Sequence, residues 1–233
     1  MNTPNLQLPY LAAAQAQKHV TVNEALGLLD TVVQLAVESR ALTDPPASPA
    51  DGACYIPASG AAGAWAAWDF NLAVWRDGAW SKLVPKDGWK AWIKDERLGA
   101  VYQDGIWRDG IALTGHGGRI TLRAKEEELT LAGAYVETAD AAFVPDRAIV
   151  LAVAARTTQQ VAGAASYDVG ISGEPSKFGG SLGVAAGSTN IGVIGPTAFY
   201  ADTKVRITAN GGDFAAGKVR LIAYFLEMTA PAS

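Results

Sequence analysis

The sequence predicts a mainly β protein with one N-terminal helix, a small Trp-rich antiparallel β module and a C-terminal β-sandwich of jelly-roll type. Aromatic residues flank repeated Asp-Gly pairs in the first half, and alternating apolar runs separated by Gly-rich connections fill the second half. A heptad-spaced apolar stripe precedes both. We divide the 233 residues into an arm and assembly helix (1–42), the Trp-rich module (43–113), connecting strands (114–135) and the sandwich (136–233).

The helix is predicted to begin at Thr21 and to end near residues 39–42. Thr21 and Glu24 have the spacing of a capping box, and Asp44-Pro45-Pro46 follows as a stop signal. Apolar residues then recur at alternating spacings of four and three: Val22, Leu26, Leu29, Val33 and Ala36.

This stripe spans too few turns to be stable alone in water, so it needs a partner. One hypothesis is that it packs on the chain's own β domain. We favour the other, that residues Val22, Leu26, Leu29 and Val33 join copies of the chain into a homo-oligomer. Fibre-like proteins commonly have cyclic symmetry, and a trimer is the favoured copy number, although the seam residues do not select it.

The module that follows contains an internal near-repeat. All seven tryptophans lie between Trp65 and Trp107, and residues 74–80 (Val-Trp-Arg-Asp-Gly-Ala-Trp) resemble residues 101–107 (Val-Tyr-Gln-Asp-Gly-Ile-Trp). Asp-Gly tolerates the positive φ angles of a type I′ turn, so each copy predicts a β-hairpin. A third pair, Asp109-Gly110, is a further candidate turn.

Two-residue turns place one aromatic pair on one face of each hairpin. We therefore propose flat platforms for the apolar face of a sugar, with nearby carboxylates for its hydroxyls. The candidate saccharide-binding residues are Trp75, Trp80, Tyr102, Trp107, Asp77 and Asp104. The alternative hypothesis is that all of these rings fill the core of a small β module.

The second half predicts an all-β domain. Residues 120–131 predict two short strands or a hairpin with a charged tip, residues 148–153 a central strand, and residues 219–226 a closing strand. The Gly/Ser-rich stretch from Gly173 to Thr197 predicts a long surface loop. It offers a competing saccharide site, with Tyr167, Phe178 and Tyr200 as candidate platforms.

Composition argues against several classes of function. A net charge of −4 lacks the attraction that drives nucleic-acid binding, and the longest apolar run, residues 148–155, is too short for a membrane span. The N-terminus has no secretory signal. One cysteine and two histidines, with no recognised catalytic motif, lead us to expect no catalytic residue, no metal and no cofactor. Cys54 is expected to be a small core hydrophobe.

The residue pattern also resembles a known family. Residues 8–26 (Leu-Pro-Tyr-Leu-Ala-Ala-Ala-Gln-Ala-Gln-Lys-His-Val-Thr-Val-Asn-Glu-Ala-Leu) are similar to the opening of a family encoded among bacterial prophage and gene-transfer-agent structural genes. The Asp-Gly-x-Trp motifs and residues 173–183 and 194–200 continue this resemblance. Val22 stands where a polar residue is common in that family.

The resemblance implies a spike or fibre subunit of a phage-like particle, made in the bacterial cytoplasm and carried on the particle surface. It implies attachment to host-cell capsular polysaccharide and contact with other structural proteins of the particle. We therefore expect a non-enzymatic, saccharide-binding role. The alternatives are a structural connector of the particle and, less favoured, a glycan-cleaving enzyme, which would need two paired carboxylates.

Overall fold

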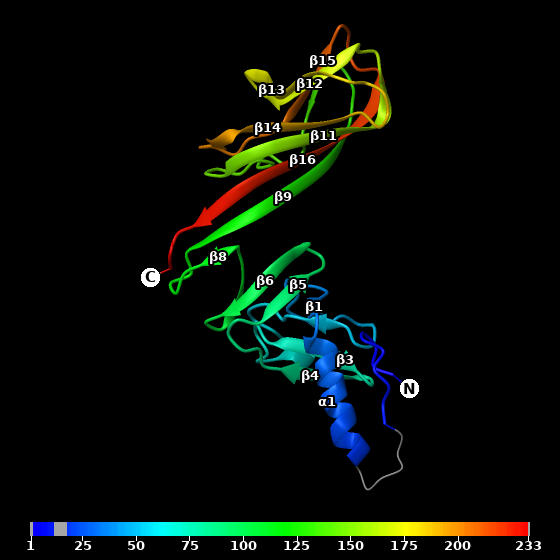
Figure 1. Ribbon diagram of the computed structural model, residues 1–233, viewed down its shortest axis with the longest axis vertical. Coiled ribbons are helices and arrows are strands. Elements are labelled where there is room, and N and C mark those ends of the chain that lie inside the picture. Colours follow the sequence, from blue (N-terminus) through cyan, green and yellow to red (C-terminus); the bar gives the residue numbers. More distant parts are fainter. Residues whose placement is uncertain (1, 12–17, 233) are drawn as a thin grey trace. The chain divides into compact units, whose positions relative to one another are not determined.

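The computed structural model describes residues 2–11 and 18–232, of Lys18 the backbone only (Figure 1). The chain divides into two compact units, unit 1 (Met1–Gly110) and unit 2 (Ile111–Ser233). The described residues are mainly β, with one α-helix, in unit 1. The predicted fold class is therefore confirmed. The part of the predicted arm at residues 12–17 lies outside the described residues.

Unit 1 combines the helix with two small sheets. Its elements are α1 (Lys18–Val32), β1 (Ala36–Val37), β2 (Cys54–Tyr55), the 3-10 helix η1 (Gly63–Trp65), β3 (Leu72–Arg76), β4 (Ala79–Leu83), β5 (Lys90–Ile93), β6 (Leu98–Gln103) and β7 (Ile106–Asp109). One sheet has the order β2-β3-β4 and the other β1-β5-β6-β7. Only β1 pairs in parallel with its neighbour, β5; the other pairs are antiparallel.

The two Asp-Gly hairpins are confirmed. Asp77 and Asp104 both have φ of 50°, and the glycines that follow them also have positive φ, as a type I′ turn requires. The predicted cross-strand pairs are Trp75 with Trp80 and Tyr102 with Trp107, and both are present. Asp109-Gly110 is no hairpin turn, because Asp109 ends β7 and the chain continues into unit 2.

The near-repeat is a repeat of structure as well. The backbone N–H of Asp77 donates to the Asp51 carboxylate, and that of Asp104 donates to the Asp87 carboxylate. Asp51 and Asp87 each precede a glycine, Gly52 and Gly88, whose N–H bonds to the carbonyl of the first aromatic residue in its hairpin. Each copy is thus a three-stranded meander with one Asp-Gly pair before its first strand and another at the turn between its second and third strands.

The helix differs from its predicted bounds. It begins at Lys18 rather than Thr21 and ends at Val32 rather than near 39–42. Gln34 takes a left-handed conformation with φ of 57°, which stops the helix well before the prolines. Ala36, predicted on the helical seam, instead lies in β1 opposite Trp92. The sequence pattern did not reveal this helix end, because the apolar spacing continues past Gln34, where the helix has already stopped.

Polar and small residues dock α1 onto its own unit. The Arg76 guanidinium donates to the Gly27 carbonyl (2.5 Å) and to the Thr31 hydroxyl (3.0 Å). A Cβ on Gly27 would lie 2.2 Å from an Arg76 nitrogen, so a larger residue at this position would displace the guanidinium. The buried side of α1 is therefore polar rather than apolar.

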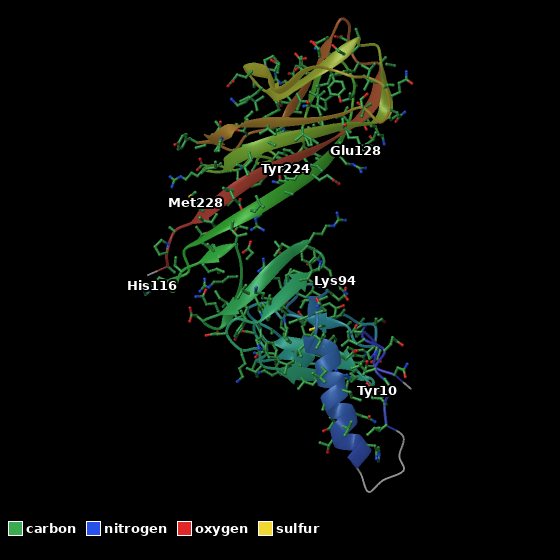
Figure 2. All side chains as sticks on the ribbon, viewed as in Figure 1. Tyr10, Lys94, His116, Glu128, Tyr224 and Met228 are labelled. Atoms are coloured by element: carbon green, nitrogen blue, oxygen red, sulfur yellow. The ribbon has the colours of Figure 1, made fainter. Side chains whose placement is uncertain are left out.

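The N-terminal arm is held by one buried carboxylate. Asp30 is 2% exposed and accepts hydrogen bonds from the N–H of Leu6 (2.5 Å) and of Asn5 (3.1 Å) and from the Asn5 side chain. The Asn23 side chain pairs with the backbone of Leu11 through both its oxygen and its nitrogen. Tyr10 of the arm lies beside α1 (Figure 2). These bonds explain why polar residues lie on the inner side of the helix.

Unit 2 is a jelly roll. Its strands are β8 (Ala112–Leu113), β9 (Arg119–Thr130), β10 (Tyr135–Glu137), β11 (Ile149–Ala162), β12 (Ser166–Ile171), β13 (Glu174–Leu182), β14 (Thr189–Ala198), β15 (Arg206–Asn210) and β16 (Ala216–Thr229). They form antiparallel sheets with the orders β10-β15-β12-β13 and β14-β11-β16-β9-β8 (Figure 1). Successive strands from β9 to β16 alternate between the sheets, except for the β12–β13 hairpin, which is jelly-roll connectivity. The predicted sandwich is confirmed.

The predicted hairpin or pair of short strands at residues 120–131 is wrong. All of these residues except Leu131 belong to the single strand β9, which pairs along its whole length with β16. Glu126 and Glu128 point outward, and Glu128 forms an ion pair with Arg220 of β16 at 2.9 Å. Glu127 accepts from the N–H of Ala139 instead. Successive glutamates on opposite faces of β9 thus have different partners, which allows a charged run inside a strand. Residues 114–135 are therefore part of the jelly roll and not a connection between domains.

The predicted surface loop from Gly173 to Thr197 is also wrong. This stretch contains most of β13 and β14, each an edge strand of its sheet. Glycine lets the two edges approach closely, because a Cβ on Gly192 would lie 1.7 Å from the carbonyl oxygen of Phe178. The glycines that suggested a loop therefore permit close backbone packing.

Acid should release the arm from Asp30. Burial raises the pKa of this carboxyl, but hydrogen bonds from Thr3, Leu6 and Asn5 outweigh burial and hold the pKa below its ordinary 3.8. The carboxylate therefore stabilises the docked arm at pH above 3.8, and this contribution is lost as the pH falls through the lowered pKa. NMR relaxation of the Asn5 and Leu6 amides should report the release.

Replacing Asp30 with Asn should loosen the arm at neutral pH, since an amide cannot accept all of these bonds. The expected cost is about 1.5–3 kcal/mol of docking free energy. Glu24→Gln, an exposed change on the same helix, is the control and should leave the arm amides unchanged. Amides that stay rigid in the Asp30→Asn protein would contradict this assignment.

Candidate functional site

The first aromatic pair lies at the edge of a cluster of rings. Trp75 and Trp80 are both half-buried, with ring centroids 5.0 Å apart and planes at 61°. Trp80 also packs edge-on against Trp65, at 4.9 Å, and against Tyr55, at 5.8 Å. Trp65 is fully buried. This pair is therefore part core and part surface, as the sequence predicted for at least one pair.

The second pair is placed differently. Trp107 is only 7% exposed, and its indole N–H donates to the carbonyl of Phe70 at 3.0 Å. Its partner Tyr102 is half-buried, 5.3 Å away between ring centroids. The prediction that Trp107 is a sugar platform is therefore wrong.

The difference arises because the two meanders contribute opposite faces to one core. Cys54 and Val74 reach this core from the first meander, whereas Ala91, Ala100 and Trp107 reach it from the second. The aromatic face of the second hairpin is thus turned inward, while that of the first lies on the other side of its sheet. Equivalent sequence positions consequently have unequal exposure.

Asp77 and Asp104 are both exposed at the hairpin turns. Their positive φ angles and their backbone bonds to the preceding Asp-Gly turns show that each has a structural role. Their carboxylates remain accessible to solvent. They can accept hydrogen bonds from a hydroxyl-bearing ligand, but the turn alone accounts for their presence.

Two of the three candidate platforms in unit 2 lie in its core. Tyr167 is buried with its hydroxyl 2.9 Å from that of Thr157, and burial raises the pKa of Tyr167. Phe178 is buried in the same core. Both side chains point between the two sheets, so the prediction that they are platforms is wrong. Tyr200 is 83% exposed and remains a candidate, but without these neighbours.

Among the described residues of unit 1, Trp92 is the exposed tryptophan that the predicted site omitted. It lies on β5 and is 49% exposed. A shallow hollow of about 400 Å³ adjoins it, lined by Val32, Gln34, Leu35, Lys90, Ala91 and Trp92. The sequence contains a signal for this face, since Lys90-Ala91-Trp92-Ile93 alternates polar and aromatic with apolar residues. That alternation places Lys90 and Trp92 together on the outward side of a strand.

In a second hollow, the polar side chains Asp30 and Lys94 are already engaged with other residues. This hollow has a volume of about 230 Å³ between the arm, α1 and β1, and Asp30, Glu38, Cys54 and Lys94 are among its lining residues. Asp30 holds the arm, and Lys94 donates to Glu38 at 2.6 Å. Burial raises the pKa of Cys54 to about 12, so its thiol is protonated and unreactive at neutral pH.

The predicted oligomerisation residues occupy the outward side of α1. Leu29 is 48% exposed, and Val22 and Val33 are also exposed, whereas Leu26 is half-buried. Leu28, on the same outward side, is exposed as well. These apolar residues do not pack on the β sheets of their own unit, which leaves them available to another molecule.

In the described part of the chain, no group of three or more His, Cys, Asp and Glu side chains is arranged to hold a metal ion. Among those same residues, no helix has both the length and the apolar character needed to cross a membrane.

Comparison with known proteins gives one family match. Residues 22–108 match the family described as "protein of unknown function (DUF2793)". The matched region contains most of α1 and both sheets of unit 1. A search of curated protein sequences found no match. The match covers less than half of the chain and contains both the outward side of α1 and Trp92.

Replacing the buried Trp107 should lower the stability of the protein much more than replacing the exposed Trp92. Trp107→Ala should lower the free energy of unfolding by about 3–5 kcal/mol, because it leaves a cavity in the core of unit 1. Trp92→Ala should cost about 1 kcal/mol or less, since half of the ring is already in solvent. Denaturant unfolding followed by Trp fluorescence reports unit 1 alone, because all seven tryptophans lie there. Equal losses in the two variants would contradict these assignments.

Proposed function

We propose that this protein is a self-associating spike or fibre subunit of a phage-like particle that binds polysaccharide on the host-cell surface. The observation that carries this proposal is the set of accessible indole rings in unit 1: Trp75, Trp80 and Trp92. A partly exposed indole offers a rigid apolar face together with a polar N–H group. Pyranose rings, with an apolar C–H face and peripheral hydroxyls, suit such a surface.

The particle assignment depends on the resemblance of residues 8–26, 173–183 and 194–200 to phage-like structural proteins. The jelly roll of unit 2 is compatible with it, since viral capsid and lectin domains both use this architecture. That likeness concerns fold alone and gives no residue a role. Attachment to a host capsule is therefore tested by binding rather than argued from architecture.

Self-association is proposed to use the outward side of α1. Leu28, Leu29 and Val33 are exposed there, while the inner side of the helix is occupied by Arg76 and the arm. Burying these residues between copies would remove apolar surface from water. It would also raise several weak saccharide sites to high avidity, by roughly 100-fold or more when one polymer spans them. A trimer remains our favoured copy number.

The second candidate function is a structural connector of the particle that binds no sugar. The burial of Trp65 and Trp107 favours this alternative, because these rings are explained by the core alone. A glycan-cleaving enzyme is the third candidate, and release of reducing ends from bound polymer would identify it.

Binding should be measurable on an array of bacterial surface polysaccharides. We expect the intact chain to bind at least one polymer, with a single-site dissociation constant in the millimolar range, about 4 kcal/mol. We also expect no increase in reducing ends during incubation. Binding to no polymer would favour the connector, and time-dependent release of reducing ends would favour the enzyme.

Assembly should depend on the outward side of α1. Leu29→Glu should shift the intact chain from oligomer to monomer in light scattering at micromolar concentration, because a carboxylate cannot be buried without a partner. Ile191→Glu is the matched control, since it makes the same apolar-to-acidic change at an exposed residue of unit 2. A monomeric wild-type chain, or an unchanged Leu29→Glu oligomer, would contradict this interface.

A further inference from the structure

The geometry points to the outward face of the β1-β5-β6-β7 sheet, centred on Trp92, as a binding site for acidic saccharides. This inference rests on the proposed saccharide-binding function and gives it a location and a ligand class. It differs from the hairpin site predicted from the sequence, because the Trp75–Trp80 pair lies in the other sheet.

Trp92 is the platform of this site. Register places it between Ala36 of β1 and Gly99 of β6, both of which have little or no side chain. The indole, 49% exposed, therefore has no large cross-strand neighbour on either side. A flat ligand can approach the ring along the sheet surface.

Gly99 keeps that approach open. It has no positive φ, and a Cβ at this position would meet no atom within 4 Å. Backbone conformation and packing therefore do not require glycine here. Glycine weakens a strand, and one inside a strand often marks a place where a ligand comes close. The missing side chain at Gly99 clears the space beside the indole.

The hollow beside Trp92 has the size and lining of a small-molecule site. Its volume of about 400 Å³ falls within the range of roughly 300–1,000 Å³ typical of ligand pockets. Val32 and Leu35 supply apolar surface, and Gln34 supplies an amide at the point where α1 ends. An adjoining hollow of about 310 Å³ is lined by Val32, Leu35, Trp89 and Lys90.

Two cations without partners give the face its preference for acids. Lys90 and Arg108 lie in one cross-strand row with Val101 between them. Neither forms an ion pair with any residue that the structure describes, and the buried Nε of Arg108 has no hydrogen-bond partner. By contrast, Lys94, the residue after β5, is paired with Glu38. Unpaired guanidinium and ammonium groups favour a carboxylate ligand.

The cations at the other aromatic surface already donate hydrogen bonds. Near the Trp75–Trp80 pair, the Arg76 guanidinium donates to the Gly27 carbonyl and the Thr31 hydroxyl. Lys82 donates to the carbonyl of Ala67. A sugar carboxylate would therefore compete with fewer existing hydrogen bonds on the Trp92 face.

The test uses hexasaccharides of polymannuronate, polyguluronate and polygalacturonate, each also in carboxyl-reduced form, titrated calorimetrically into the intact protein. The polysaccharide array is repeated with native and carboxyl-reduced polymers. Wild type should bind acidic forms about tenfold or more tightly than reduced ones. Trp92→Ala should weaken binding by about tenfold or more, and the matched control Trp68→Ala, at a half-buried tryptophan of unit 1 outside both aromatic surfaces, should not.

Two further variants test whether binding is lost because the site is blocked or altered, and not because the protein misfolds. Gly99→Val adds a β-branched side chain beside the indole, so it should leave thermal stability equal or higher while it abolishes binding. The double variant Lys90→Gln, Arg108→Gln should remove the preference for acidic over reduced sugars. Loss of binding in Gly99→Val at unchanged melting temperature would support a site at this face.

The outcomes distinguish the two proposals. Binding that survives Trp92→Ala and Gly99→Val, or that is equal for acidic and reduced sugars, overturns this inference and leaves the proposed function standing. If binding is lost in Trp75→Ala but kept in Trp92→Ala, the inference about the Trp92 face is overturned and the proposed function still stands. If wild type binds no hexasaccharide and no array polymer, both proposals fail.

Discussion

The polar docking of α1 is the constraint on which unit 1 depends. Arg76 reaches the helix backbone because Gly27 has no side chain, and Asp30, on the buried side of the helix, holds the arm. With these contacts on the inner side, apolar residues such as Leu28 and Leu29 have only the outward side to occupy. The arrangement inverts the usual amphipathic helix, in which the apolar stripe covers the core.

A second constraint is the unequal packing of the two meanders. Their Asp-Gly hairpin turns and the backbone bonds at those turns are equivalent, yet one meander supplies the Val74 face and the other the Trp107 face to a shared core. One aromatic pair is thereby brought partly to the surface and the other is buried. The outward face of the second meander carries Trp92, Lys90 and Arg108 instead. The two meanders therefore have similar hairpins but different surfaces.

Unit 2 shows how pairing partners override local composition. The acidic run of β9 lies in a strand because Arg220 of β16 binds Glu128, while Glu127 turns to the backbone of Ala139. Gly-rich residues form β13 and β14 because the edges of the two sheets come close at Gly192. In both cases residues far away in the sequence supply the stabilising contact.

Local sequence signals were enough to predict the fold class, the two Asp-Gly hairpins and the facing of Trp75 with Trp80, because turn chemistry and the two-residue strand period act over a few residues. Tertiary structure decided where α1 ends, which rings are core, and that Tyr167 and Phe178 lie inside the sandwich. It also decided that Trp92 stays exposed. Burial depends on which face of a strand meets another layer, and that choice is made by contacts between segments distant in the chain.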